Sequence, residues 1–284
     1  MAQHRLTKAG IIHRVQTFEG RHEWPPVSLA TAAVEWMELH AIKAGKRTRD
    51  DGFINAMWQQ LLNDARTLEE AKKYSEAYQR YLDLAASFNG LQDVAQIETK
   101  VNQLSNSREL KAAIREEQAE IRKQRELESR LYALIAARNG GASINQSEEG
   151  VDAGNLLPNI LNDLRKQSKG SEDSTERRVA RRVLDGLFVG LFEQGIGLLQ
   201  TEKNYSDAIK ALKLATGVNP DRPGAFFYLA WAYAANRDKK KSLQSLNTAV
   251  EKGFSDIAMI TANKAFDILR NDPEYEQIMA RLRK

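Results

Sequence analysis

The sequence predicts an all-α protein built largely from short helices packed in pairs. Its 284 residues are 42% hydrophobic and 28% charged, and they include only six prolines. Glu, Lys, Arg, Ala, Leu and Gln dominate while β-branched residues are sparse, a composition that favours helices. The second observation is an internal recurrence, because Ala208 and Ser242 lie 34 positions apart, as do Leu212 and Leu246. A fixed period of this size is typical of helix–turn–helix repeats that stack on one another.

Composition also bears on the class of protein. Cysteine is absent, which excludes disulfides and thiolate metal sites. The net charge of +4 is too small to imply nucleic acid by itself. No apolar run approaches the roughly 20 residues needed to span a membrane, and no apolar stretch follows Met1 as in a signal peptide. We therefore expect no membrane span, no signal peptide and no cofactor in this chain. Its compartment stays unknown, since a longer parent protein could be exported.

The first predicted region, residues 1–45, does not resemble a helical repeat. Ile11 to Phe18 is rich in β-branched and aromatic residues and predicts a short strand. Residues 19–26 contain a glycine and two prolines, which predict a loop. Ser28 is then placed to cap a helix, whose apolar face would consist of Leu29, Ala32, Ala33, Trp36 and Leu39.

The stretch Phe18-Glu-Gly-Arg-His22-Glu-Trp24-Pro25-Pro26, followed by a helix, resembles the C-terminal end of an α/β-hydrolase of the esterase or dienelactone-hydrolase kind. In that family the last strand ends in a Gly-x-His-x-Trp-Pro loop. The resemblance implies that His22 matches the base of a catalytic triad and that Trp24 and Pro25 shape its loop. It covers only about residues 8–43, and no Gly-x-Ser-x-Gly nucleophile motif follows.

Without its nucleophile a histidine base performs no acyl transfer, so His22 would be catalytic only if the serine and the acid precede residue 1. The alternative is a surface-loop histidine without a function. Metal binding is disfavoured because the four histidines lack the His-Glu-x-x-His spacing that puts two ligands on one helix face.

The second region, residues 46–138, is predicted to be helical after a polar connector at 45–55. Residues 57–88 are interpreted as a degenerate repeat or, equally, as an ordinary helical hairpin, and 91–104 as a short helix. A long charged helix follows from Arg108 to Arg138. Apolar residues are sparse in this helix, and two of them, Ile114 and Ile121, lie one heptad apart. The helix is therefore either a solvated helix stabilised by ion pairs or the seam of a coiled-coil dimer.

Residues 139–155 are rich in Gly, Ser, Asn and Glu and predict a flexible linker before the last region, 156–284. A short helix is expected at 156–169, and Asp173 to Glu176 is a candidate capping box for the next helix. That helix carries a basic stripe, which is either a wet face or a contact for phosphate or an acidic partner: Arg177, Arg178, Arg181 and Arg182. No aromatic residues interleave with it, which disfavours single-stranded nucleic acid.

The block from Gly190 to Gly253 carries the recurrence and resembles the tetratricopeptide (TPR) repeat, an α-solenoid of helical hairpins. Gly195 falls near the small-residue position of a first helix, with about one extra residue in the turn before Tyr205. Asn204 and Asp238 are predicted N-caps of the two second helices. Pro273 is predicted to start the final helix of a terminal cap like that of many bacterial TPR proteins, which an open stack requires.

Five aromatic residues crowd the helix before the second turn: Phe226, Phe227, Tyr228, Trp231 and Tyr233. Such a run is usually core at a repeat interface, but Tyr228 and Trp231 lie three apart and are our candidates for a peptide-binding groove. The favoured function is a non-catalytic module that binds a protein or peptide. The alternatives are the C-terminal part of a serine esterase or peptidase with His22 as base, and a structural dimeriser that self-associates through the long charged helix.

Overall fold

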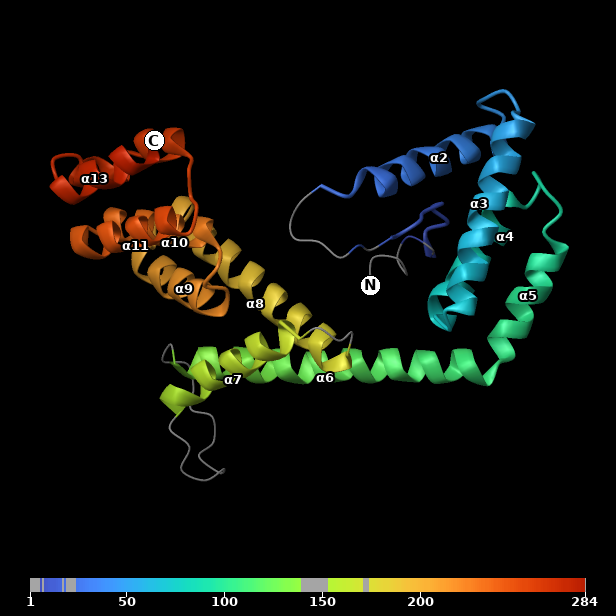
Figure 1. The fold of residues 1–284 in the computed structure, drawn as a ribbon, viewed down its shortest axis with the longest axis horizontal. Coiled ribbons are helices and arrows are strands. Elements are labelled where there is room, and N and C mark those ends of the chain that lie inside the picture. Colours follow the sequence, from blue (N-terminus) through green and yellow to red (C-terminus); the bar gives the residue numbers. More distant parts are fainter. Residues whose placement is uncertain are drawn as a thin grey trace. The chain divides into compact units, whose positions relative to one another are not determined.

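The structure is a computed structural model, and it describes residues 6, 8–16, 18, 24–138, 153–170 and 174–283, with side chains omitted at Arg138 and 153–155. Over these residues the chain is all-α (Figure 1). It divides into two compact units, Met1–Glu116 and Glu117–Lys284, and the division falls inside one long helix, α6.

Unit 1 contains α2 (Val27–Lys43), α3 (Asp51–Glu70), α4 (Tyr74–Phe88), α5 (Ala95–Asn106) and the first part of α6 (Arg108–Arg138). α4 packs against both α3 and α5. The core joins α2 to α5 through buried apolar side chains, among them Leu39, Ile54, Tyr81, Leu84 and Phe88.

Two expectations for the N-terminal region are wrong. Residues 11–16 and 18 form no strand, and the described residues contain no other strand that could pair with them; the one β-bridge, Asn89 with Gln92, is isolated. Ser28 does not cap α2, because the helix already begins at Val27, directly after the two prolines. Its N-cap position is Pro26, which offers no side-chain acceptor.

Unit 2 contains the end of α6, then α7 (Ala153–Ser168), α8 (Thr175–Gln200), α9 (Tyr205–Val218), α10 (Pro223–Ala235) and α11 (Lys239–Glu251). A terminal segment follows: α12 (Ile257–Thr261), the 3-10 helix η1 (Lys264–Leu269) and α13 (Pro273–Leu282). Packing follows chain order, with α7 on α8, α8 on α9, α9 on α10 and α10 on α11. Figure 1 shows this series in yellow to orange, and α13 packs on α11 at its end.

Helix starts in unit 2 follow the polar residues before them. Asn204 Oδ1 accepts from Asp207 N at 3.3 Å and Asp238 Oδ1 accepts from Lys241 N at 3.2 Å, which confirms both predicted N-caps. Pro273 begins α13 as expected. For α8 the cap is Ser174, whose hydroxyl accepts from Arg177 N at 3.2 Å. Asp173, the first residue of the predicted capping box, lies outside the described residues.

Three helical hairpins repeat one buried pattern: α3–α4, α8–α9 and α10–α11. Each has a small residue on its first helix, which is Ala65, Gly195 or Ala230. Each also has three buried residues at matching steps of its second helix: Ala77, Tyr81 and Leu84; Ala208, Leu212 and Ala215; Ser242, Leu246 and Ala249. The buried Ser242 hydroxyl donates to Ala230 O at 2.9 Å, so even its polar atom is satisfied across the pair.

The turns of these hairpins are also alike. Lys73 N donates to Leu68 O and Asp238 N to Tyr233 O, each spanning five residues, whereas Asn204 N donates to Leu198 O, one residue further back. This confirms the predicted extra residue before Tyr205. Each turn also holds one basic residue with positive φ: Lys72 at 59°, Lys203 at 54° and Arg237 at 63°.

α8 is the only helix of the described residues whose length and composition would allow it to cross a membrane. A core helix passes the same test, so this is weak evidence against the expectation of no span. Nine residues of α8 are buried, among them Val183, Leu187 and Leu191, which pack in the cluster shared with α6, α7 and α9.

Candidate peptide-binding groove

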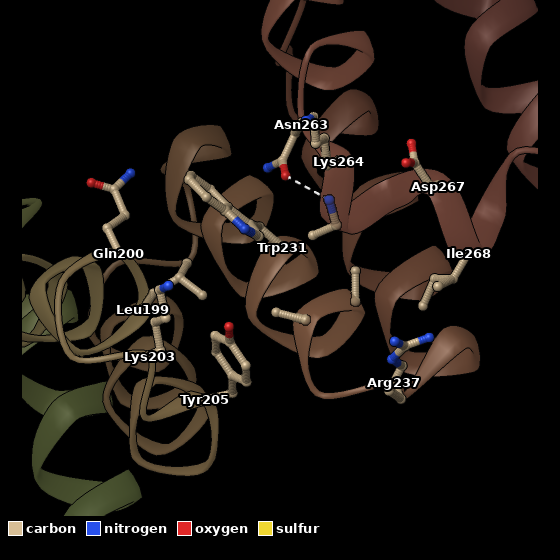
Figure 2. Close-up of a pocket in the computed structure, with 13 residues that line it drawn as sticks. Leu199, Gln200, Lys203, Tyr205, Trp231, Arg237, Asn263, Lys264, Asp267 and Ile268 are labelled. Atoms are coloured by element: carbon tan, nitrogen blue, oxygen red, sulfur yellow. Dashed lines mark hydrogen bonds between the residues drawn. The ribbon is translucent and has the colours of Figure 1, made fainter.

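A groove of about 720 Å³ opens in unit 2 among the C-terminal end of α8, helix α10 and η1 (Figure 2). Trp231 of α10 lies between its two walls. One wall is formed by Leu199, Lys203 and Tyr205. The other consists of Asn263, Lys264, Ala265, Asp267 and Ile268. The groove is therefore bounded by the first helices of two neighbouring hairpins, by the turns that follow these helices, and by η1 of the terminal segment.

Trp231 is held by aromatic packing on its own helix. Tyr228 stacks on it, with ring centroids 5.7 Å apart and planes 23° apart, and Phe227 lies 6.4 Å away on a tilted ring. Tyr228 in turn meets Phe192 of α8 edge to face at 5.4 Å. Phe227 is completely buried, whereas Trp231, about one helical turn further along α10, is half-buried. The indole of Trp231 therefore faces both the core and the groove.

The η1 wall is fixed by a short cap and two anchors. Asn263 Oδ1 accepts from Ala265 N at 3.0 Å, the bond drawn in Figure 2. Phe266 and Leu269 are buried in the core beneath. The remaining residues of this short helix, including Lys264 and Asp267, line the groove.

The charges along the groove are predominantly basic. Lys203, Arg237 and Lys264 line it, and all three are exposed. The side chains of these three residues form no ion pair within the described part of the chain. The only carboxylate in the lining, Asp267, pairs with Arg270 at 2.7 Å. Next to the Arg237 turn, Asp238 is tied to Lys241 at 2.7 Å, a hydrogen bond that lowers the pKa of Asp238.

A second hollow, of about 410 Å³, lies in unit 1 along the N-terminal segment and is lined by Arg14, Trp36, His40 and Asp83. Arg14 is nearly buried and lies 3.7 Å from Asp83. Burial, followed by the nearby charge of Arg80, lowers the pKa of Arg14. Burial, followed by the nearby charge of Lys43, lowers the pKa of His40. The charged residues that line this hollow are Arg14, Lys43 and Asp83. Arg14 is paired with Asp83, and Lys43 Nζ donates to Ala86 O at 2.9 Å, so both cations already have partners within unit 1.

The structure places the predicted site residues as follows. Trp231 lines the groove, whereas Tyr228 lies behind it in the aromatic stack. His22 lies outside the described residues, and Trp24 beside it is 93% exposed. No group of three or more His, Asp or Glu side chains placed to hold a metal ion occurs among residues that the structure describes.

The basic stripe of α8 is not simply a wet face. Glu120 of α6 accepts from Arg182 at 2.9 Å, from Thr175 at 3.0 Å and also from Arg178. Lys123 pairs with Glu176 at 3.0 Å. These contacts join α6 to α8 within unit 2, so part of the stripe has an acidic partner inside the molecule.

Sequence reasoning missed the basic residues of the groove. Lys203 and Arg237 each stand one position before a predicted N-cap, Asn204 and Asp238. Because both residues have the same position relative to an N-cap, the sequence could have predicted that Lys203 and Arg237 lie at the same edge of neighbouring hairpins. Lys264 carried no such signal, because η1 interrupts the period.

Comparisons of the chain with protein families, with curated proteins and with solved structures found no match.

Proposed function

We propose that this protein is a non-catalytic helical-repeat module of the TPR kind that binds an extended peptide or protein segment in the groove around Trp231. The observation that carries the proposal is the position of Trp231, an incompletely buried aromatic side chain in a groove of about 720 Å³. Aromatic residues that keep one face open at a concave surface are common anchors of protein interfaces.

The repeated hairpins support the same function. α8 and α10 are first helices of neighbouring hairpins, and stacked hairpins generate a concave surface lined by equivalent elements. The buried pattern shared by Gly195, Leu212, Ala230 and Leu246 supplies a rigid base for that surface. Tyr228 would contribute indirectly, by holding the indole through the aromatic stack.

The test is selection from a random dodecapeptide library on the full chain, with affinities measured by fluorescence anisotropy. We expect the selected peptides to bind with dissociation constants in the micromolar range. Trp231→Ala should weaken their binding at least tenfold. Tyr228→Phe, which keeps the stacked ring and removes only the hydroxyl, is the matched control and should bind normally. A selection without enrichment, or full affinity in a folded Trp231→Ala protein, contradicts the proposal.

A second candidate function is favoured by one observation. Of the twelve exposed large hydrophobic side chains among the described residues, eight lie between Ile11 and Met37. A surface this apolar usually contacts another protein surface. Because residues 8–43 resemble the end of an α/β-hydrolase, we propose a serine hydrolase domain as the partner of this surface, with His22 as its base.

This candidate is tested by labelling with a fluorophosphonate in cells that make the protein, followed by peptide mapping of the labelled bands. A labelled band containing peptides of α2 and α10 supports a hydrolase joined to this module. If no labelled band contains them, the hydrolase assignment is wrong, whereas the peptide-binding proposal is unaffected.

A further inference from the structure

We infer that the ligand of the Trp231 groove is an acidic peptide segment, a conclusion that rests on the function proposed above. Its carboxylates would lie against Lys203, Arg237 and Lys264, and a neighbouring apolar side chain would pack on Trp231. The groove alone suits a bound segment of any charge, whereas the residues that line it indicate an acidic one.

The first argument is the charge of the groove. Its four charged lining residues comprise three cations and one carboxylate, and Asp267 is already paired with Arg270 at 2.7 Å. The lining cations form no ion pair among the described residues, so their charge is available to a ligand. Glu202, beside Lys203, is exposed but is not part of the lining. Opposite charge placed along such a surface raises the rate of association and makes binding selective for partners of that charge.

The second argument is the placement of the cations by the backbone. Lys203 and Arg237 occupy the same left-handed position in two successive hairpin turns, with φ of 54° and 63°. Non-glycine residues adopt this conformation at a cost of about 1 kcal/mol. The shared turn geometry presents one cation per hairpin at the same edge of the series. Carboxylates spaced along an extended peptide match such a row, whereas a single small anion would use only one of them.

A peptide fits the groove better than nucleic acid does. Single-stranded nucleic acid is bound by aromatic platforms that stack successive bases along a continuous basic track. Here Tyr228 lies behind Trp231 rather than beside it in the lining, and Asp267 sits in the opposite wall. One half-buried indole and a few separated cations suit a peptide with mixed apolar and acidic side chains.

The experiment uses the peptides selected on the full chain in the test above. We expect Asp and Glu to be enriched in them over the input library. Affinity should fall at least tenfold between 50 and 300 mM NaCl, because the cations are exposed and salt screens them. The double charge reversal Lys203→Glu/Lys264→Glu should weaken binding at least tenfold, with little change in far-ultraviolet circular dichroism.

The matched control is Lys169→Glu/Lys213→Glu, which changes the net charge equally at two exposed lysines outside the groove lining. It should leave affinity within a factor of two. A fluorescein-labelled oligothymidylate of twelve nucleotides is the competing probe. Binding of the oligonucleotide as tight as that of the peptides would overturn the assignment to a peptide.

The possible failures are distinguishable. Peptides that require Trp231 but are not acidic, or that bind both charge-reversal proteins equally, overturn this inference and leave the proposed function standing. A library that yields no binder overturns both.

Discussion

At the scale of the residue, the packing of α8 on α9 depends on the absence of a side chain at one position. A Cβ built on Gly195 of α8 would lie 2.6 Å from Leu212 Cγ of α9, whereas one on Gly197 would meet nothing within 4 Å. In the equivalent places of the other hairpins the small residue is alanine, Ala65 or Ala230. The α8–α9 pair thus differs from the other two hairpins in requiring a glycine. It is also the pair whose turn contains one extra residue.

Gly195→Ala is therefore expected to destabilise the protein by about 1–3 kcal/mol, because the added methyl group overpacks a buried contact. Gly197→Ala on the same helix should instead stabilise it by up to about 1 kcal/mol, since alanine is the better helix former. Urea unfolding monitored by circular dichroism measures both. Equal effects of the two substitutions would mean that the Leu212 contact does not limit the packing.

Glu120 of α6 accepts hydrogen bonds from three residues of α8. Burial alone would raise its pKa, but hydrogen bonds from Arg178, Arg182 and Thr175 outweigh burial and lower the pKa below the ordinary value. A carboxyl group whose pKa is lowered by folding stabilises the fold above its unfolded pKa of about 4.3. This stabilisation is lost as pH falls through the folded pKa.

We expect Glu120→Gln to cost about 2 kcal/mol at pH 7, the range for hydrogen bonds to charged groups. The difference between the two proteins should shrink as pH falls below 4, because the native carboxylate then becomes protonated as well. Urea unfolding at pH 7, 5 and 3.5 measures it. A difference that stays constant over this range would show that the charge of Glu120 is not what matters.

At the scale of the element, helix ends were predicted better from the sequence than was the N-terminal strand. Asn204, Asp238 and Pro273 act locally, through bonds or ring constraints within one turn, so the sequence alone identifies them. A strand needs a partner, and the apolar run from Ile11 finds none among the described residues. Composition can show that a segment suits a strand, but it cannot show that the sheet is present.

The left-handed turns yield a prediction that separates stability from binding. Lys203→Gly should stabilise the fold by about 1 kcal/mol, because glycine adopts positive φ without steric cost. The same substitution removes one cation from the groove, so it should weaken the binding of acidic peptides several-fold. Thermal unfolding and anisotropy on the same protein measure the two effects. A protein that gains stability and keeps its full affinity would exclude Lys203 from the binding site.

At the scale of the whole molecule, the same hairpin pattern occurs in both units. The sequence shows the recurrence between Ala208 and Ser242 because the 34-residue step is regular there. For residues 57–88 it allows either a degenerate repeat or an ordinary helical hairpin. The structure shows that Ala65, Ala77 and Leu84 are buried as their counterparts are. Tyr81 disguised the match: it stands where the other hairpins have leucine, and its hydroxyl donates to Glu69 at 3.1 Å.

The groove was only partly predictable. Trp231 was identified from the aromatic crowding of its helix, whereas the opposite wall comes from η1, which follows no repeat. No pattern within residues 263–268 indicates which of their side chains line a groove, because that depends on how η1 packs on α10. The role of Tyr228 and that of His22 stay predictions.

Because each unit has its own buried clusters, core substitutions should act within one unit. Leu84→Ala and Leu246→Ala remove fully buried side chains and should each cost about 3 kcal/mol. Hydrogen exchange read by mass spectrometry should show lost protection mainly in α3–α5 for the first protein and in α8–α13 for the second. Loss of protection throughout the chain in both would mean that the two units unfold as one.

Self-association through α6 is tested by light scattering after size exclusion. Ile114 and Ile121 are each 37% exposed, which leaves little apolar surface for a seam. If the long charged helix dimerises the chain, Ile114→Lys/Ile121→Lys should convert a dimer into a monomer. A wild-type protein that runs as a monomer at 100 µM removes this function.

The two ends of the hairpin series in unit 2 are unlike its middle. The first half of α8 is committed to α6 and α7, while α11 is covered by α13. Neither end could receive another copy without exposing or displacing a specialised surface. Lengthening of this architecture by gene duplication would therefore proceed through insertion between existing hairpins. Relatives with more repeats should keep both terminal segments and differ in chain length by multiples of about 34 residues.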